Sequence, residues 1–211
     1  FTRLDGGLGI DRFVVKTATT LELLGYINGR VFGFEEYVLE SQGDSRIEVD
    51  LNSLGDFAGS GETGELTVYV KSGDQFKVLG DAIYASPEMV GDQFAQVITS
   101  DESKLQIVSE RPWQNVILES DANHNGDISV ADALAILNHL SAFGSDLPAE
   151  PVLANFRGIF PDVSGDNIAT ALDALLVLNG LALVGDAEGE ERELPMLAEP
   201  AAAFEAAMLS E

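Results

Sequence analysis

Short apolar runs separated by turn residues fill the first half of the chain. Between residues 13 and 109 these runs partly alternate and are rich in β-branched and aromatic residues, which is typical of β-strands. Their regular spacing predicts an N-terminal all-β domain, built either as a sandwich or as the cap of a β-solenoid. The clearest strand candidates are residues 12–15, 21–27, 47–51, 66–70 and 104–108.

Turn signals lie between the predicted strands. The pair Asn28-Gly29 predicts a tight β-hairpin, because both residues accept the positive φ angles of a type I′ turn. Other turns are expected at Gly43-Asp44, Gly73-Asp74 and Gly91-Asp92.

After Pro112 the pattern changes from strands to helices. Two stretches rich in Ala and Leu place apolar residues three and four positions apart, as on one face of an α-helix. The predicted stripes are Val130, Ala133, Leu134, Leu137 and Leu140, and then Leu172, Leu175, Leu176, Leu178 and Leu181. The expected fold is α+β and multidomain. Its parts are a β-rich domain at 1–112, a small all-α module at 113–185 and an acidic flexible tail at 186–211.

The two helical stretches are copies of one another. A shift of 41 positions aligns Asp121 with Asp162 and Asp132 with Asp173, and the leucines that follow stay in register. Polar and apolar positions agree together, so we interpret the pair as an internal duplication. A long connection, about residues 142–160, is expected between the copies.

Each copy opens with a segment that has the ligand pattern of a calcium loop. An EF-hand-type loop supplies oxygens from positions 1, 3, 5, 7, 9 and 12, and it turns sharply at position 6. In loop 1, residues 121–132, Gly126 stands at the turn, Ser129 is expected to cap the next helix, and Ile128 to anchor the loop to its partner. The predicted ligands are Asp121, Asn123, Asn125, the carbonyl of Asp127, and Asp132.

Loop 2, residues 162–173, departs from this pattern at two positions. Asn167 replaces the turn glycine, although Asn tolerates the left-handed conformation, and Ala169 replaces the large apolar residue. The predicted ligands are Asp162, Ser164, Asp166, the carbonyl of Ile168, and Asp173. An Asx-rich turn before a helix cap would favour the same residue types, but two copies in register favour calcium.

The motif D-x-N-x-N-G-D-I-S-V-A-D-A-L and its partner D-x-S-x-D-N-I-A-T-A-L-D-A-L resemble the paired loop–helix repeats of type I dockerins, modules of secreted bacterial proteins. The resemblance covers about residues 113–184. It implies an antiparallel helix pair, two Ca²⁺ ions held by the ligands named above, and a cohesin-like partner bound on the helix faces. The implied recognition positions are Val130, Ala131, Ala171 and Leu172, none of which carries a hydroxyl.

Charge and composition limit the classes of binding partner and the expected cellular location of the protein. The formal charge of −25 argues against nucleic acid and anionic membranes as partners. No cysteine is present, and no apolar run is long enough to span a bilayer. The chain begins at Phe1 rather than Met, so we read it as a processed or truncated piece, and we expect a secreted or cell-surface protein.

Other motifs carry less weight. The nonapeptide from Gly6 through Asp11 to Val14 matches a calcium β-roll repeat, and it is either the end of such a roll or a glycine turn into a strand. His124 and His139 are expected to be exposed and inert.

No catalytic residue is predicted. Glu35, Glu36 and Glu110 could form a glycosidase pair, but spacing in sequence does not place carboxylates together in space. The favoured function is a calcium-binding, dockerin-like interaction module on a β-rich extracellular domain, non-catalytic in this chain. Two alternatives stay open: a fragment of a polysaccharide-degrading glycoside hydrolase that carries a dockerin, and an adhesive surface protein rigidified by calcium.

Overall fold

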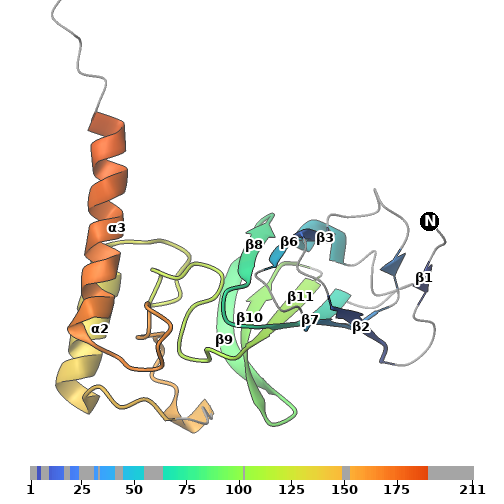
Figure 1. Cartoon of the computed structure of the whole chain (residues 1–211), viewed down its shortest axis with the longest axis horizontal. Coiled ribbons are helices and arrows are strands. Elements are labelled where there is room, and N and C mark those ends of the chain that lie inside the picture. The colour runs from blue at the N-terminus through green and yellow to red at the C-terminus, as the bar shows by residue number, and fades with distance from the viewer. Residues whose placement is uncertain are drawn as a thin grey trace, which may run out of the picture.

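The protein consists of a β-rich region and a pair of helices that stand side by side beyond its last strands (Figure 1). The computed structural model describes residues 4–5, 10–16, 20–23, 31–32, 34–40, 45–54, 64–101, 103–148 and 153–189.

The β-rich region is a solenoid whose strands stack in parallel, one coil upon the next. In the first two coils β1 (Leu4–Asp5) pairs with β4 (Val31–Phe32), β2 (Arg12–Val15) with β5 (Glu36–Leu39), and β3 (Thr20–Leu23) with β6 (Arg46–Asp50). A third coil adds β7 (Gly64–Val70) beside β5 and β8 (Gln75–Leu79) beside β6. This parallel stacking decides between the two predicted architectures in favour of the solenoid.

An antiparallel unit ends the solenoid. Strand β10 (Gln93–Thr99) runs antiparallel to both β9 (Ile83–Val90) and β11 (Ser103–Ser109), and β11 joins the parallel sheet by pairing in parallel with β7. Gly91 has φ +64° between β9 and β10, at the predicted Gly91-Asp92 turn. Pro87 lies on the edge strand β9 where the register shifts, so its missing N–H removes no ladder hydrogen bond.

The described strands on either side of the predicted Asn28-Gly29 hairpin do not pair with each other. Strands β3 and β4 lie in different sheets, and each pairs in parallel with a strand of the other coil. The hairpin itself stays a prediction. The turn itself, like Gly43-Asp44 and residues 6–9 of the β-roll motif, lies outside the described residues.

The solenoid encloses a continuous apolar core. Tyr37, Ile47, Val68 and Ile107 are among its fully buried members, and one inward-facing residue follows another from coil to coil. Val116 and Ile117, which come after the last strand, pack against the same core. The segment that leads into the helical part therefore also closes one end of the solenoid.

The helical part contains α2 (Val130–Phe143), a short 3-10 turn η3 (Leu153–Asn155) and α3 (Ala171–Gly189). Helix α3 continues four residues past the predicted start of the tail, and residues 190–211 lie outside the described part of the chain. Neither of the two helices is long and apolar enough to cross a membrane.

The helices pack mainly through small side chains. Ala133 and Ile136 of α2 and Ala174 and Val177 of α3 are buried between them, and Leu140 and Leu181 pack against this cluster. The predicted stripes therefore divide between two environments: Ala133, Leu140 and Leu181 contact the cluster, whereas the other leucines are exposed, namely Leu134, Leu137, Leu172, Leu175, Leu176 and Leu178. Alanine allows a close helix approach, which turns the larger leucines outward.

Candidate calcium-binding site

Loop 1 folds around the carboxylate of its first residue. Asp121 accepts hydrogen bonds from the backbone N–H groups of Asn125 (3.1 Å) and Gly126 (2.8 Å). Asp132 accepts from the N–H of Asn123 at 3.0 Å and of Ser129 at 2.9 Å. Positions 1, 3, 5 and 12 of the predicted ligand set are thereby brought together.

Loop 2 repeats this arrangement residue by residue. Asp162 accepts from the N–H groups of Gly165, Asp166 and Asn167, and Ser164 Oγ donates to it at 3.3 Å. Asp173 accepts from the N–H of Ser164 and of Thr170, both at 2.8 Å. The position-7 residues Asp127 and Ile168 donate their N–H to the position-5 side chains, so their role as carbonyl ligands stays a prediction.

Both loops lead directly into capped helices. Ser129 accepts from the N–H of Ala131, and with Asp132 it forms a capping box at the start of α2, as predicted. Thr170 accepts from the N–H of Leu172 at the start of α3. The carboxylate at position 12 therefore joins the loop to the first helical turn in each copy.

Four carboxylates in the loops are completely buried. Asp121, Asp132, Asp162 and Asp173 have no exposed surface, and within the described residues no Lys, Arg or His forms an ion pair with any of them. Burial raises the pKa of Asp121 and of Asp162, although backbone N–H groups oppose the shift, and the paired Asp at position 12 raises it further. Two like charges buried together without a cation are strongly destabilising.

These residues fit a calcium ion better than they fit a transition metal. Among the described residues, no group of three or more His, Cys, Asp or Glu side chains gathers in a way that could hold a metal by itself. A site in either loop must therefore include amide, hydroxyl and main-chain oxygens, which is the mixed all-oxygen set that calcium accepts.

Residues outside the loops, which the sequence pattern did not single out, hold both of them. Asn115 donates to the carbonyl oxygen of Asp121 at 2.9 Å, and Gln114 donates to that of Val163 at 2.9 Å. The N–H of Asp162 donates to the carbonyl of Trp113 at 3.2 Å. No local pattern marks such side chains, because they precede the loops and carry no ligand spacing.

The prediction that His124 and His139 are exposed is wrong. His124 is half-buried, its ring lying 4.9 Å from those of Tyr84 and Phe160, and burial lowers its pKa to about 4. His139 is also half-buried, 5.3 Å from the ring of Phe143, and burial lowers its pKa as well. His124 belongs to the contact between loop 1 and strand β9.

Ile128, the predicted anchor of loop 1 to loop 2, is partly exposed (37%). The isolated bridge formed by the second loop joins Ile168 to Asp146. Ala169 at the equivalent position of loop 2 is buried and donates its N–H to the carbonyl of Ser145. The small residue in loop 2 thus makes room for the chain that leaves α2.

The acidic residues considered for catalysis have structural partners. Glu35 accepts the N–H of Asp11 at 2.8 Å, and Glu36 forms an ion pair with Arg12 at 2.6 Å. Glu110 accepts from the N–H of Ser72 at 3.4 Å. Two of these contacts join the first coil of the solenoid to the second, and the third joins Glu110 to the turn between β7 and β8.

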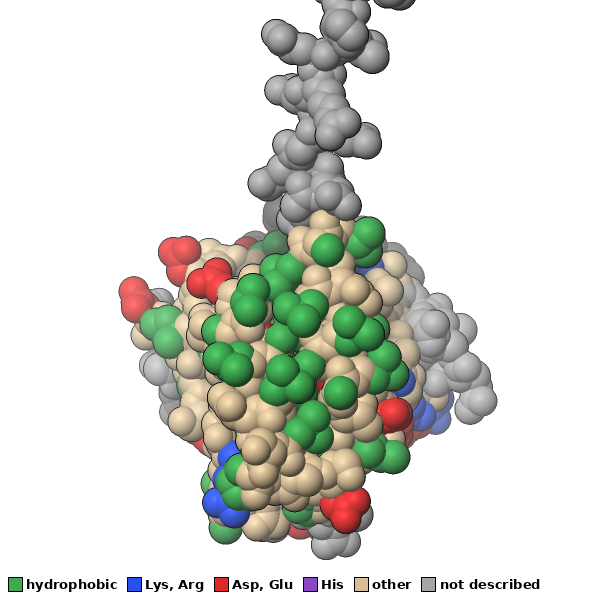
Figure 2. All heavy atoms as spheres, turned by 90° about the vertical axis from the view of Figure 1, so that its left-hand side faces the viewer, with side chains coloured by type: hydrophobic (Ala, Val, Ile, Leu, Met, Phe, Trp, Pro, Cys, Tyr) green, Lys and Arg blue, Asp and Glu red, His purple; other side chains and the backbone are tan. Residues whose placement is uncertain are grey.

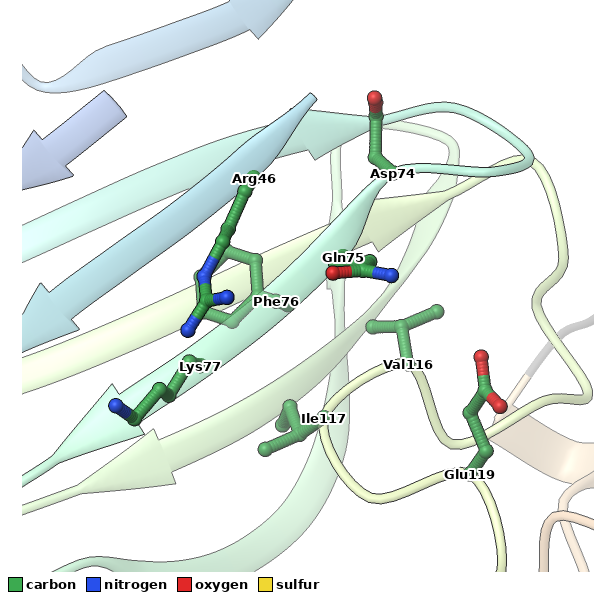
Figure 3. Close-up of a pocket in the computed structure, with 8 residues that line it drawn as sticks. All are labelled: Arg46, Asp74, Gln75, Phe76, Lys77, Val116, Ile117 and Glu119. Atoms are coloured by element: carbon green, nitrogen blue, oxygen red, sulfur yellow. The ribbon is translucent and has the colours of Figure 1, made fainter. Parts of the chain in front are cut away.

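A cavity of about 370 Å³ lies between β8 and the segment that follows β11 (Figure 3). Its charged lining residues include Arg46, Asp74, Lys77 and Glu119. Arg46 and Lys77 both contact Glu48, and Asp74 accepts two backbone N–H groups. Three of its four charged groups therefore already have protein partners.

A face of exposed apolar side chains covers the two helices (Figure 2). It includes the predicted recognition positions, with Val130 65% and Leu172 52% exposed, and Ala131 and Ala171 exposed beside them. The helix residues from Val130 to Phe143 carry only Asp132, which is buried, and His139 as ionisable groups. Large uncharged patches of this kind mark protein contact sites.

Two loops of the calcium type, each leading into a helix, together define a duplicated loop–helix module with an apolar outer face. Residues 119–182 match the dockerin type I domain family. The chain therefore carries a dockerin type I-like module after its solenoid, and this part is a protein–protein interaction module. No curated protein and no solved structure matches the chain.

Proposed function

We propose that the module binds two Ca²⁺ ions, one in each loop, and that calcium makes it competent to bind its partner. The supporting observation is the two pairs of buried carboxylates, Asp121 with Asp132 and Asp162 with Asp173, which lack a cation among the described residues. The ligands are those predicted from the sequence. An ion would neutralise each pair and fix the loop from which the following helix starts.

Calorimetric titration of the calcium-free chain tests this proposal. We expect two sites in the wild type and one site in each of the variants Asp132→Asn and Asp173→Asn. Asp92→Asn removes the same charge from an exposed turn, so it serves as the matched control and should keep two sites. Absence of calcium binding in the wild type would refute the proposal.

We further propose that the apolar face of α2 and α3 binds a cohesin-like domain. The face is uncharged, it lies on the helices that the loops initiate, and it contains Val130, Ala131, Ala171 and Leu172. Burial of Leu137 and Leu178 against a partner would contribute about 1.5–3 kcal/mol for each side chain.

A pull-down with cohesin-type domains, in calcium and in chelator, tests the partner. Leu137→Glu and Leu178→Glu should each abolish capture, since each buries a charge in the interface. Ile83→Glu changes an exposed residue of the solenoid and should bind normally. Capture that is equal in chelator, or unaffected by both leucine variants, would contradict calcium-dependent docking on this face.

The whole chain is then a solenoid carried with an anchoring module in a secreted or cell-surface protein, and it is non-catalytic in itself. We propose boundaries near residues 112 and 185, with the tail beyond. The hydrogen bonds and the ion pair of Glu35, Glu36 and Glu110 fit a structural role for these three glutamates. Incubation of the full chain with a panel of plant polysaccharides should release no reducing sugar.

A further inference from the structure

A line of buried amide side chains connects the solenoid with both loops. Gln96 lies in β10 and is 1% exposed. It donates to the carbonyl oxygen of Gln114 at 2.5 Å and accepts from the N–H of Val116 at 3.2 Å. A strand of the solenoid thereby holds the short segment that precedes loop 1.

Gln114 and Asn115 each hydrogen-bond to a different loop. Gln114 reaches loop 2 through the carbonyl of Val163, while Asn115 reaches loop 1 through the carbonyl of Asp121. Asn115 Nδ2 also lies 3.5 Å from a carboxylate oxygen of Asp121 and 3.3 Å from Nδ1 of His124. Both amides are almost completely buried, so each of these hydrogen bonds is sheltered from water.

The same segment closes the solenoid. Asn115 Oδ1 accepts from the N–H groups of Ile117 and Leu118, and this turn sets Val116 and Ile117 against the apolar core. A displacement of Asn115 would therefore change both the first residue of loop 1 and the end of the core.

Direct packing adds a second connection. A Cβ on Gly126 of loop 1 would lie 2.8 Å from the Tyr84 ring of β9. A Cβ on Gly165 of loop 2 would meet Arg111 and Gln114 at 2.6 and 2.9 Å. Each loop thus presses its glycine against a side chain that belongs to the solenoid or to the segment after it.

We propose that Gln96, Gln114 and Asn115 are positioning residues for the two calcium loops, and that they couple calcium binding to the closed end of the solenoid. The inference rests on the proposed calcium function. Coupling is reciprocal: if the solenoid end pre-orders the loops, calcium must stabilise the solenoid end by the same factor. The solenoid is then a part of the metal site and not a separate passenger.

Hydrogen exchange on the full wild-type chain tests the coupling without any substitution. Calcium should slow exchange in β10 and in residues 113–118 by about fivefold or more, in addition to the loops and helices. Slowing that is confined to residues 119–189 would overturn the proposal while leaving calcium binding intact. Absence of any change, together with no calcium binding, would instead refute the calcium function itself.

Three variants of the full chain test the residues individually. The backbone N–H resonances of Gly126 and Asn167 report separately on loops 1 and 2 as calcium is added. Gln114→Met should weaken loop 2 by about fivefold and loop 1 less, Asn115→Ala should do the reverse, and Gln96→Met should weaken both.

Gln106→Met is the matched control. It removes a buried amide of β11 that hydrogen-bonds to Thr67 and Glu88. Gln106 pairs with Val97, the residue after Gln96 in β10, and successive residues of a strand point to opposite faces, so Gln106 and Gln96 lie on opposite faces of the sheet. Affinities in all three variants that equal the control would overturn the positioning role, and so would an equal loss at both loops in Gln114→Met and Asn115→Ala. Loss confined to the expected loops would establish it.

Discussion

The solenoid and the loop–helix module solve the problem of burial in opposite ways. The solenoid core is almost entirely apolar, with Tyr37, Val68 and Ile107 in register on neighbouring strands. The core of the module is small, built from alanines and a few β-branched residues, and it lies beside four buried carboxylates. Most of the leucines on its helices are exposed. Apolar burial can stabilise the solenoid, whereas under the proposed function the module gains additional stability from bound calcium and from its partner.

This contrast explains why the two regions share an interface. Phe94 of β10 packs against Trp113, Phe156 and Phe160, with ring centroids 5.5 to 6.4 Å apart. Aromatic side chains of the module thus pack against the solenoid, in addition to the small apolar cluster between its own helices. The difference between the regions becomes measurable when calcium, side-chain volume, pH or loop conformation is changed.

Removal of calcium should have the largest effect, and mainly on the module. At free calcium 100 to 1,000 times Kd, each site contributes about 3–4 kcal/mol, so chelation should lower the helical melting transition by about 10 °C or more. Circular dichroism in calcium and in chelator measures this change. Magnesium serves as the control, since it demands near-octahedral geometry. Identical melting curves in calcium and in chelator would show that the module does not depend on calcium for its stability.

A substitution within the module should separate its buried face from its outward face. Ile136 is completely buried between the helices, and Ile136→Ala should cost about 2–4 kcal/mol in the free energy of unfolding. Leu134, two residues earlier, is 56% exposed, and Leu134→Ala should cost less than about 0.5 kcal/mol. Denaturant unfolding in calcium gives both values. Equal costs would show that the exposed face of α2 contributes as much to folding as the buried face does.

Alkaline pH should act on the solenoid through Tyr37. Burial, and then the charge of Glu35, raises the pKa of Tyr37 to about 12 from its ordinary value of 10.0. The unfolded chain loses this proton first, so the stabilisation is complete below pH 10 and is lost as pH rises from 10 to 12. The loss is about 2–3 kcal/mol.

Tyr37→Phe isolates this effect. Its hydroxyl has no hydrogen-bond partner among the described residues, so the variant should be at least as stable as the wild type at pH 8. Between pH 10 and 12 its unfolding free energy should fall less steeply than that of the wild type. Parallel slopes would show that another group controls alkaline unfolding.

Sequence spacing predicted what depends on neighbours along the chain. The Ser129 cap and the starts of both helices depend on residues only a few positions apart, so their pattern could be read from the sequence. The buried face of α2 was predicted only in part, since the predicted stripe includes Ala133 and Leu140 but not Ile136. Ala133, Ile136 and Leu140 have the same helical spacing as Val130, Leu134 and Leu137, so spacing alone does not separate the two faces. Volume, and not period, decides which stripe allows the helices to approach.

The pairing of strands that are far apart in the chain could not be predicted from the sequence either. Alternating apolar strands fit a hairpin and a parallel coil equally well, so the partner of β3 could not be read from residues 20–23. The contact of Asn115 with loop 1 spans only six residues, yet it depends on Gln96 and the solenoid end for its position. Such residues are recognised by their burial and their hydrogen-bond partners, which are known only from the folded structure.

The smallest expected effect compares the two loops at their turns. Positions 4 and 6 have positive φ in both loops, but the glycine alternates: loop 1 has His124 (58°) and Gly126 (89°), and loop 2 has Gly165 (72°) and Asn167 (64°). A Cβ added to either glycine would lie within 3 Å of a neighbouring side chain, while Asn167 is exposed. Close contact, in addition to backbone conformation, therefore decides where glycine is required.

Exchanging these residues tests that explanation. Gly126→Asn should cost about 1–2 kcal/mol, because its side chain must displace the Tyr84 ring, whereas Asn167→Gly should change stability by no more than about 0.5 kcal/mol. In a double-mutant cycle, Gly126→Asn should cost less free energy of unfolding in the Tyr84→Ala background than in the wild type, because the ring that opposes the new side chain is gone. Equal costs at the two turns would mean that the φ angle alone selects the residue. The glycine of loop 1 would then carry no information about how tightly the solenoid holds the loop.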